Sequence, residues 1–174
     1  MIHFPKKEFK STKYLKNKLK SFPSMNNLDL ATEISTSNVY SFSISDKKII
    51  NPLKLKDKFI AVIDYGVKKN ILRMMDFKGI QTIIFPVTFP LSDIIRLNPN
   101  GIFLSNGPGD PTATYLKYKK ELDLLKDFKK PIFGICLGHQ ILSLIFGAKT
   151  EKMHHGHRGA NHPIKNLNNK PFRC

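Results

Sequence analysis

The pattern that sets the architecture begins at Phe59-Ile60-Ala61-Val62-Ile63, a continuous apolar run typical of a strand buried on both faces. Helical spacing follows over residues 67–77, and Gly79 is placed to end that helix. Strand and helix patterns then alternate, with predicted strands at 82–87, 101–105 and 131–136 and predicted helices at 91–97, 114–128 and 138–146. This alternation predicts an α/β fold, an open and mostly parallel sheet with flanking helices, whose chemistry lies at the carboxyl ends of the strands.

The pattern before residue 58 is weaker. Residues 6–20 hold seven lysines, and Leu15 and Leu19 lie one helical turn apart, which predicts a basic amphipathic helix with a thin apolar stripe. Residues 21–57 are rich in Ser, Asn and Asp. For these we expect loop, a short helix near 28–34, and then a linker.

Length and composition limit the function. The 174 residues are 41% hydrophobic and 24% charged, which suffices for one domain and part of another. No apolar run approaches the roughly 20 residues that cross a bilayer. Two cysteines make no disulfide framework, so we expect a cytoplasmic protein without membrane attachment. The net charge is +16, yet only four of the 29 cationic residues are Arg, which argues against specific recognition of nucleic acid.

The motif Gly134-Ile135-Cys136-Leu137-Gly138 stands where a strand pattern gives way to a helix pattern. This is the spacing of a nucleophile elbow, in which a strained turn presents the nucleophile and small residues relieve the crowding around it. The turn places the Cys136 sulfur at a helix N-terminus, which favours the thiolate, and leaves backbone N–H groups free for an oxyanion. A buried structural cysteine is the alternative. The position between strand and helix favours the nucleophile.

A second motif, Ser105-Asn106-Gly107-Pro108-Gly109-Asp110-Pro111, follows another predicted strand and should face the same crevice. Gly107 and Gly109 can turn backbone N–H groups toward a substrate or an oxyanion, and Pro108 stiffens the loop. Taken alone, this motif favours an ordinary turn.

Taken together, these residues resemble the class I glutamine amidotransferase family, and further stretches resemble its member that forms the small, glutamine-hydrolysing chain of carbamoyl-phosphate synthase. The resemblance implies that residues 1–57 are the C-terminal remnant of that chain's N-terminal domain plus a linker. Residues 58–174 are then a partial amidotransferase domain. The matching stretches are Phe22 to Ala31, Asp64 to Arg73, Asn106 to Asp110, Gly134 to Gln140 and Gly156 to Pro163.

The resemblance implies a role for each matching residue. Cys136 is the nucleophile, which attacks the carboxamide of L-glutamine and forms a glutamyl thioester as ammonia leaves. Gly107, Gly109 and Leu137 contribute backbone contacts to the substrate or its oxyanion, and Gln140 binds the glutamine. No metal or cofactor is implied for this chain. The ammonia passes to a separate large subunit, which uses ATP, Mg and bicarbonate to make carbamoyl phosphate for arginine and pyrimidine synthesis.

One part of the family pattern is missing. The family carries a His-x-Glu pair well downstream of its nucleophile, and the 38 residues after Cys136 contain none. The simplest interpretation is a chain truncated at both ends, with very weak glutaminase turnover. Four histidines lie close together in the sequence and could be metal ligands: His154, His155, His157 and His162. Two of them, His157 and His162, match the family's Gly156 to Pro163 segment, which binds no metal, so we expect no metal site.

Two alternatives stay open. One is another class I amidotransferase, of the anthranilate or GMP type. The other is a non-catalytic basic binding protein that uses the lysines of residues 6–20, and its binding to nucleic acid would depend steeply on salt.

Overall fold

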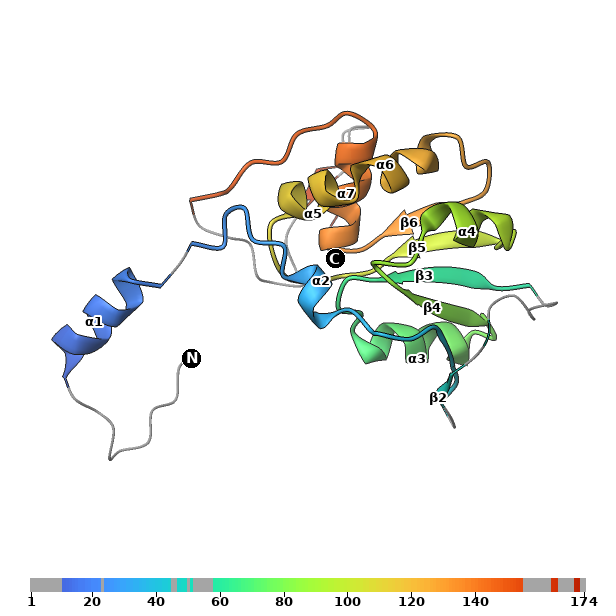
Figure 1. The fold of residues 1–174 in the computed structure, drawn as a ribbon, viewed down its shortest axis with the longest axis horizontal. Helices are drawn as coiled ribbons and strands as arrows, with labels where there is room; N and C mark the ends of the chain where they lie inside the picture. Colours follow the sequence, from blue (N-terminus) through green and yellow to red (C-terminus); the bar gives the residue numbers. More distant parts are fainter. Residues whose placement is uncertain are drawn as a thin grey trace.

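The computed structural model describes residues 11–22, 24–44, 47–49, 51, 58–154, 164–165 and 171–172. Its main feature is a six-stranded sheet in the order β2-β1-β4-β3-β5-β6 (Figure 1). Two strands, β1 and β2, are antiparallel to their neighbours, and the other four run parallel. The prediction of an open, mostly parallel α/β sheet is confirmed. The strands are β1 (Tyr40–Phe42), β2 (Lys47–Ile49), β3 (Ile60–Asp64), β4 (Thr82–Pro86), β5 (Gly101–Leu104) and β6 (Ile132–Gly134), with β7 (Ile164–Lys165) and β8 (Pro171–Phe172) as a separate pair.

Three of the predicted helices lie close to their expected bounds, and a fourth is broken. The three are α3 (Lys69–Phe77), α4 (Leu91–Arg96) and α7 (Leu137–Ile145). The single helix predicted for 114–128 is wrong, because the chain there forms α5 (Pro111–Lys117), α6 (Lys119–Leu122) and the 3₁₀ turn η3 (Asp123–Lys126). Leu122 and Leu125 are buried three residues apart, which is the spacing of a 3₁₀ turn, whereas Leu116 is 61% exposed.

The N-terminal part differs from its prediction in one respect. The described part of the basic stretch is helical, as α1 (Thr12–Lys20), and none of its residues is buried. The short helix is α2 (Ala31–Ile34). The prediction of a linker through residues 40–49 is wrong, because β1 and β2 lie there. Tyr40 and Phe42 of β1 pack in the smaller apolar cluster of the sheet. Strands of three residues are too short to show alternation in the sequence. The domain boundary after residue 57 stays a prediction.

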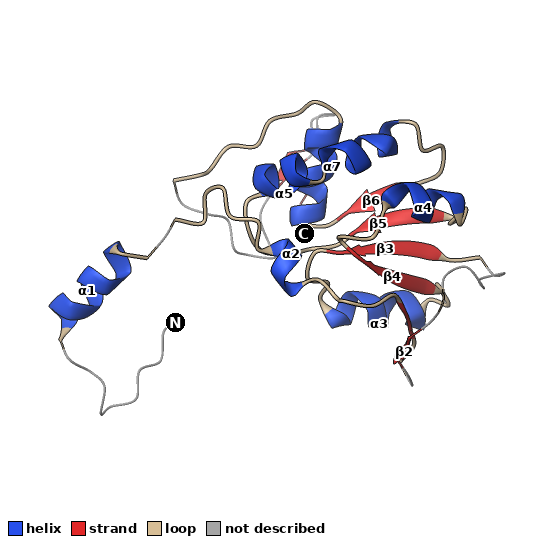
Figure 2. Ribbon diagram, in the orientation of Figure 1, coloured by secondary structure: helices blue, strands red, loops and turns tan. Residues whose placement is uncertain are grey.

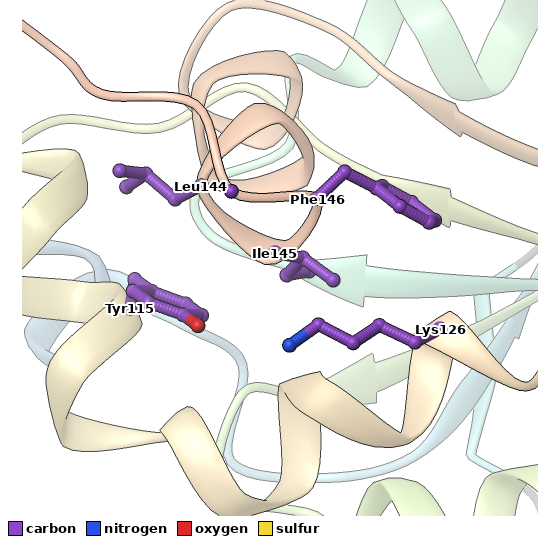
Figure 3. Close-up of a pocket in the computed structure, with 6 residues that line it drawn as sticks. Tyr115, Lys126, Leu144, Ile145 and Phe146 are labelled. Atoms are coloured by element: carbon purple, nitrogen blue, oxygen red, sulfur yellow. The ribbon is translucent and has the colours of Figure 1, made fainter.

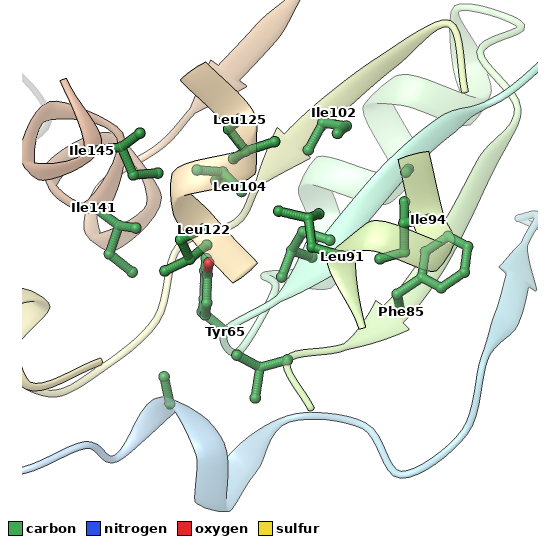
Figure 4. Packing of buried hydrophobic residues seen from close by; sticks show 14 of the residues in the cluster. Tyr65, Phe85, Leu91, Ile94, Ile102, Leu104, Leu122, Leu125, Ile141 and Ile145 are labelled. Atoms are coloured by element: carbon green, nitrogen blue, oxygen red, sulfur yellow. The ribbon is translucent and has the colours of Figure 1, made fainter. Parts of the chain in front are cut away.

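Helices cover the sheet on both faces (Figure 2). Residues Ala61 and Ile63 of β3 belong to the larger apolar cluster, under α4 to α7, while Val62 belongs to the smaller cluster under α3. Neighbouring residues of a strand point to opposite faces, so β3 is buried on both, as predicted. Figure 4 shows the larger cluster, in which Leu104 of β5 and Ile141 of α7 are fully buried.

At one side of the described sheet, β6 is the outermost strand. Its Phe133 is 64% exposed and stacks on Phe103 of β5, with ring centroids 6.0 Å apart. No helix in the described part of the chain has the length and apolar character needed to cross a membrane.

Candidate active site

The backbone at Cys136 is strained. This residue links β6 to α7 with φ 53° and ψ −114°, a conformation that residues with a Cβ rarely adopt. Its side chain is exposed, and within the described residues its thiol has no hydrogen-bond partner. Strain of this kind persists only where the surrounding structure enforces it, so the neighbours of Cys136 must supply the constraint.

Two glycines supply it. A Cβ on Gly134 would lie 2.7 Å from the backbone of Gly138, and a Cβ on Gly138 would lie 2.1 Å from the carbonyl oxygen of Leu104. The N–H of Gly138 also donates to the carbonyl of Ser105 at 3.0 Å. The first turn of α7 is therefore pressed against the end of β5. The steric reason predicted for these two small residues is present in the structure.

The glycine loop after β5 is packed equally closely. A Cβ on Gly107 would lie 2.0 Å from the carbonyl oxygen of Tyr65, and Gly109 has φ +100°. The Ser105 hydroxyl, which is fully buried, accepts the Tyr65 N–H at 2.9 Å and donates to the Asn106 carbonyl at 2.9 Å. The end of β5 and the end of β3 are thus held together through Ser105.

Sequence reasoning missed two residues that organise this edge. Asn106 accepts the Lys68 N–H through Oδ1 at 2.9 Å and donates through Nδ2 to the Gly66 carbonyl at 3.0 Å. Asp64, which is 5% exposed, accepts the N–H groups of Gly66 and Val67 at 2.9 and 2.8 Å. The available signal was a carboxylate that ends a continuous apolar strand, because a buried charge at that position needs hydrogen-bond donors.

The other predicted residues lie around the elbow. Leu137 is buried, with 1% of the whole residue exposed. Gln140 is exposed on α7, and its N–H donates to the Cys136 carbonyl at 3.0 Å. His139 is also exposed on α7. The structure brings Cys136 and Leu137 against the strand that carries the Gly107 loop, and the roles in substrate binding stay predictions.

Of the four histidines considered above as metal ligands, the structure describes His154, which is exposed. His155, His157 and His162, and most of the Gly156 to Pro163 segment with them, lie outside the described residues. Among the residues that are described, no group of three His, Cys, Asp or Glu side chains could hold a metal ion.

A shallow pocket of about 480 Å³ lies at the other end of α7 (Figure 3). Its polar wall is organised by Asp123, which accepts the Tyr115 hydroxyl at 2.9 Å and pairs with Lys126 at 3.0 Å. Hydrogen bonds, first from Lys119 and then from Lys126, hold the pKa of Asp123 well below its usual range. The helix separates this pocket from Cys136 by roughly 12 Å. The lining residues are Tyr115, Lys126, Leu144, Ile145, Phe146 and Gly147.

A mostly parallel sheet that presents a strained cysteine at a strand–helix junction, next to a glycine loop, has the geometry of a nucleophile elbow in an α/β protein. The chain belongs to the class I glutamine amidotransferase family, whose model matches residues 61–173. A crystal structure from Thermoplasma acidophilum, of a protein assigned to GMP synthase, is similar with a TM-score of 0.52 and 28% identity, over 62% of this chain and 54% of that one.

Curated relatives narrow the resemblance. The carbamoyl phosphate synthase small chain of Acinetobacter baylyi is 45% identical over 86% of this chain, and that of Pyropia yezoensis is 46% identical over 86%. The small chain of Bartonella quintana is 42% identical over 96%. This chain spans 40% of the length of the first two relatives and 42% of the third.

Proposed function

We propose that this chain is the nucleophile-bearing part of the glutamine-hydrolysing subunit of a carbamoyl phosphate synthase. The observation that carries the proposal is the strained Cys136, held at the start of α7 by Gly134 and Gly138. The names of the curated relatives, which are carbamoyl phosphate synthase small chains, support the choice within the family.

The chemistry follows from the elbow. The Cys136 sulfur attacks the carboxamide carbon of glutamine, a C–S bond forms, and the C–N bond breaks as ammonia leaves with the proton of the thiol. Water then cleaves the thioester to give glutamate and regenerates the thiol. Backbone N–H groups at Leu137 and in the Gly107–Gly109 loop stabilise the oxyanion of the tetrahedral intermediate, and Gln140 binds the substrate.

The same proposal extends to partners. Ammonia is delivered to a large synthetase subunit, which consumes ATP and bicarbonate in the cytoplasm and supplies carbamoyl phosphate to arginine and pyrimidine synthesis. An amidotransferase for GMP synthesis is the second candidate, favoured by the solved structure of 28% identity. Relatives at 42–46% identity outweigh it. Copurification with a carbamoyl phosphate synthase large subunit, rather than with a component of GMP synthase, separates the two.

A chloromethyl ketone analogue of glutamine tests the proposal. It forms a C–S bond with a correctly placed thiolate as chloride leaves, and intact-mass and peptide spectra locate the adduct. We expect the analogue to modify Cys136, to spare Cys174, and to be blocked by L-glutamine. Iodoacetamide, which needs no substrate site, serves as the control on both cysteines. Equal modification of both cysteines by the analogue, or no protection by glutamine, contradicts the proposal.

A further inference from the structure

Residues 27–36, which we call the strap, lie across the end of the sheet where three parallel strands finish (Figure 1). The strap is hydrogen-bonded to a residue at or beyond the end of each of β3, β4 and β5. Ligands of parallel sheets bind at the carboxyl ends of the strands. The strap therefore lies beside the candidate active site. The three bonds are Thr36 N–H to Asp64 Oδ2 (2.8 Å), Val87 N–H to Ser35 Oγ (2.9 Å) and Asn27 N–H to Asp110 Oδ2 (2.8 Å).

The end of the glycine loop, at Gly109 and Asp110, packs against the backbone of the strap. The Asp110 N–H donates to the Leu28 carbonyl at 2.9 Å. At Gly109 there is no room for a side chain, because a Cβ would lie 2.8 Å from the Leu28 oxygen and 2.9 Å from the Leu30 nitrogen. The position of Gly109 therefore depends on where residues 28–30 lie.

Asp29 fixes that part of the strap to α5. Its side chain is 11% exposed, and it accepts the Thr114 hydroxyl at 2.9 Å and the Lys117 ammonium at 2.8 Å. The Thr32 hydroxyl also donates to Asp29 and meets the Tyr118 hydroxyl at 2.8 Å. Burial raises the pKa of Asp29, but hydrogen bonds from Lys117, Thr32 and Thr114 outweigh it and leave the pKa below its ordinary value.

We propose that the strap is a positioning element for the glutamine site and that Asp29 is the residue that locks it in place. The inference rests on the proposed function. Asp29 touches no substrate. It acts through Leu28 on Gly109, and so on the direction of the backbone N–H groups that are needed at the oxyanion. An oxyanion donor is effective only when it is already aimed, and misplacement by about 1 Å can cost roughly a hundredfold in rate.

The experiment compares Asp29→Ala with Asp93→Ala in the full chain. Asp93 is a matched control, because its carboxylate also pairs with a cation, Arg96 at 2.9 Å, but on the exposed face of α4. The rate of Cys136 modification by the glutamine chloromethyl ketone is divided by the rate with iodoacetamide. We expect this ratio to fall by about tenfold to a hundredfold in Asp29→Ala and to stay unchanged in Asp93→Ala. Asp29→Asn, which keeps an oxygen for the Thr114 hydroxyl, should restore part of it.

Hydrogen exchange of the same proteins separates positioning from unfolding. Amides of residues 105–110 should exchange faster in Asp29→Ala, and those of α4 should not change. If the amides of Asp29→Ala lose protection from exchange throughout the chain, this variant is unfolded and Asp29→Asn is used in its place. The ratio of the two modification rates must then fall by about threefold or more in Asp29→Asn. An unchanged ratio in a folded variant overturns the strap's role while the proposed function stands. A wild-type protein that shows no preference for the analogue overturns the proposed function, and the positioning role with it.

Discussion

Replacing Gly138 with Ala tests whether contact between α7 and β5 sets the position of Cys136. Gly138 is the second residue of α7, where helix propensity favours Ala over Gly by about 1 kcal/mol. The structure predicts the opposite sign. A new Cβ would lie 2.1 Å from the oxygen and 2.4 Å from the carbon of the Leu104 carbonyl. These atoms belong to the backbone of a buried strand, which has no flexible end to move aside.

The size of the effect can be worked from these contacts. Removing the clash requires α7 to shift from β5 by roughly 1 Å, which strains the packing of Leu137 and Ile141 and the hydrogen bond from Gly138 to Ser105. Overpacking costs about 1–3 kcal/mol and the lost hydrogen bond about 1 kcal/mol. After the gain in propensity, we expect a net loss of about 1–3 kcal/mol in the free energy of unfolding.

Urea denaturation followed by far-UV circular dichroism measures this difference. His139→Ala is the control, because it changes the next residue of the same helix at an exposed position and should stay within about 0.5 kcal/mol of wild type. The glutamine chloromethyl ketone should also react more slowly with Gly138→Ala. A Gly138→Ala protein as stable as wild type, or more stable, would refute the packing argument.

Three further changes have defined outcomes. Cys136→Gly should raise the free energy of unfolding by about 1 kcal/mol in urea denaturation, because glycine adopts φ 53° without strain; Cys136→Ala, which keeps the Cβ, should give no such gain. Tyr65→Phe should raise the free energy of unfolding by about 1 kcal/mol, since the buried Tyr65 hydroxyl has no hydrogen-bond partner among the described residues. Tyr115→Phe is the control: it loses the hydrogen bond to Asp123 and should lower the free energy of unfolding. The pKa of Asp29 is lowered from its ordinary value of 3.8, so the contribution of its carboxylate to the free energy of unfolding is complete above that pH and is lost as the pH falls further. The difference in stability between wild type and Asp29→Asn should therefore narrow below pH 3.8 in acid titrations. A constant difference would contradict the assignment.

Those parts of the fold that sequence could predict are the ones with local causes. A strand buried on both faces, such as β3, needs a continuous apolar run, and the elbow at Cys136 needs glycine two positions away on either side. Both signals lie within a few neighbouring residues. The helix predicted for 114–128 failed because leucines alone do not show which of them face the core, and Leu116 turned outward.

The organisation of the site depended on contacts between distant segments. Asn106 bridges the loops after β3 and β5, and Asp29 reaches α5 across 85 residues of sequence. An Asn in a turn and an Asp before a short helix have ordinary local explanations, as turn former and helix cap. Only the folded arrangement shows that these side chains hold separate strand ends together.

The β6 side of the described sheet has a consequence for handling the protein. Among the described residues β6 is the outermost strand, and its 64% exposed Phe133 offers an apolar ring to a second copy of the chain. The net charge of +16 keeps copies apart by mutual repulsion. Salt weakens that repulsion, because the screening length falls from about 10 Å at 0.1 M to about 3 Å at 1 M. Solutions of this chain should therefore stay clear in dilute buffer and turn turbid as salt is added, which favours ion exchange over salt precipitation for its purification.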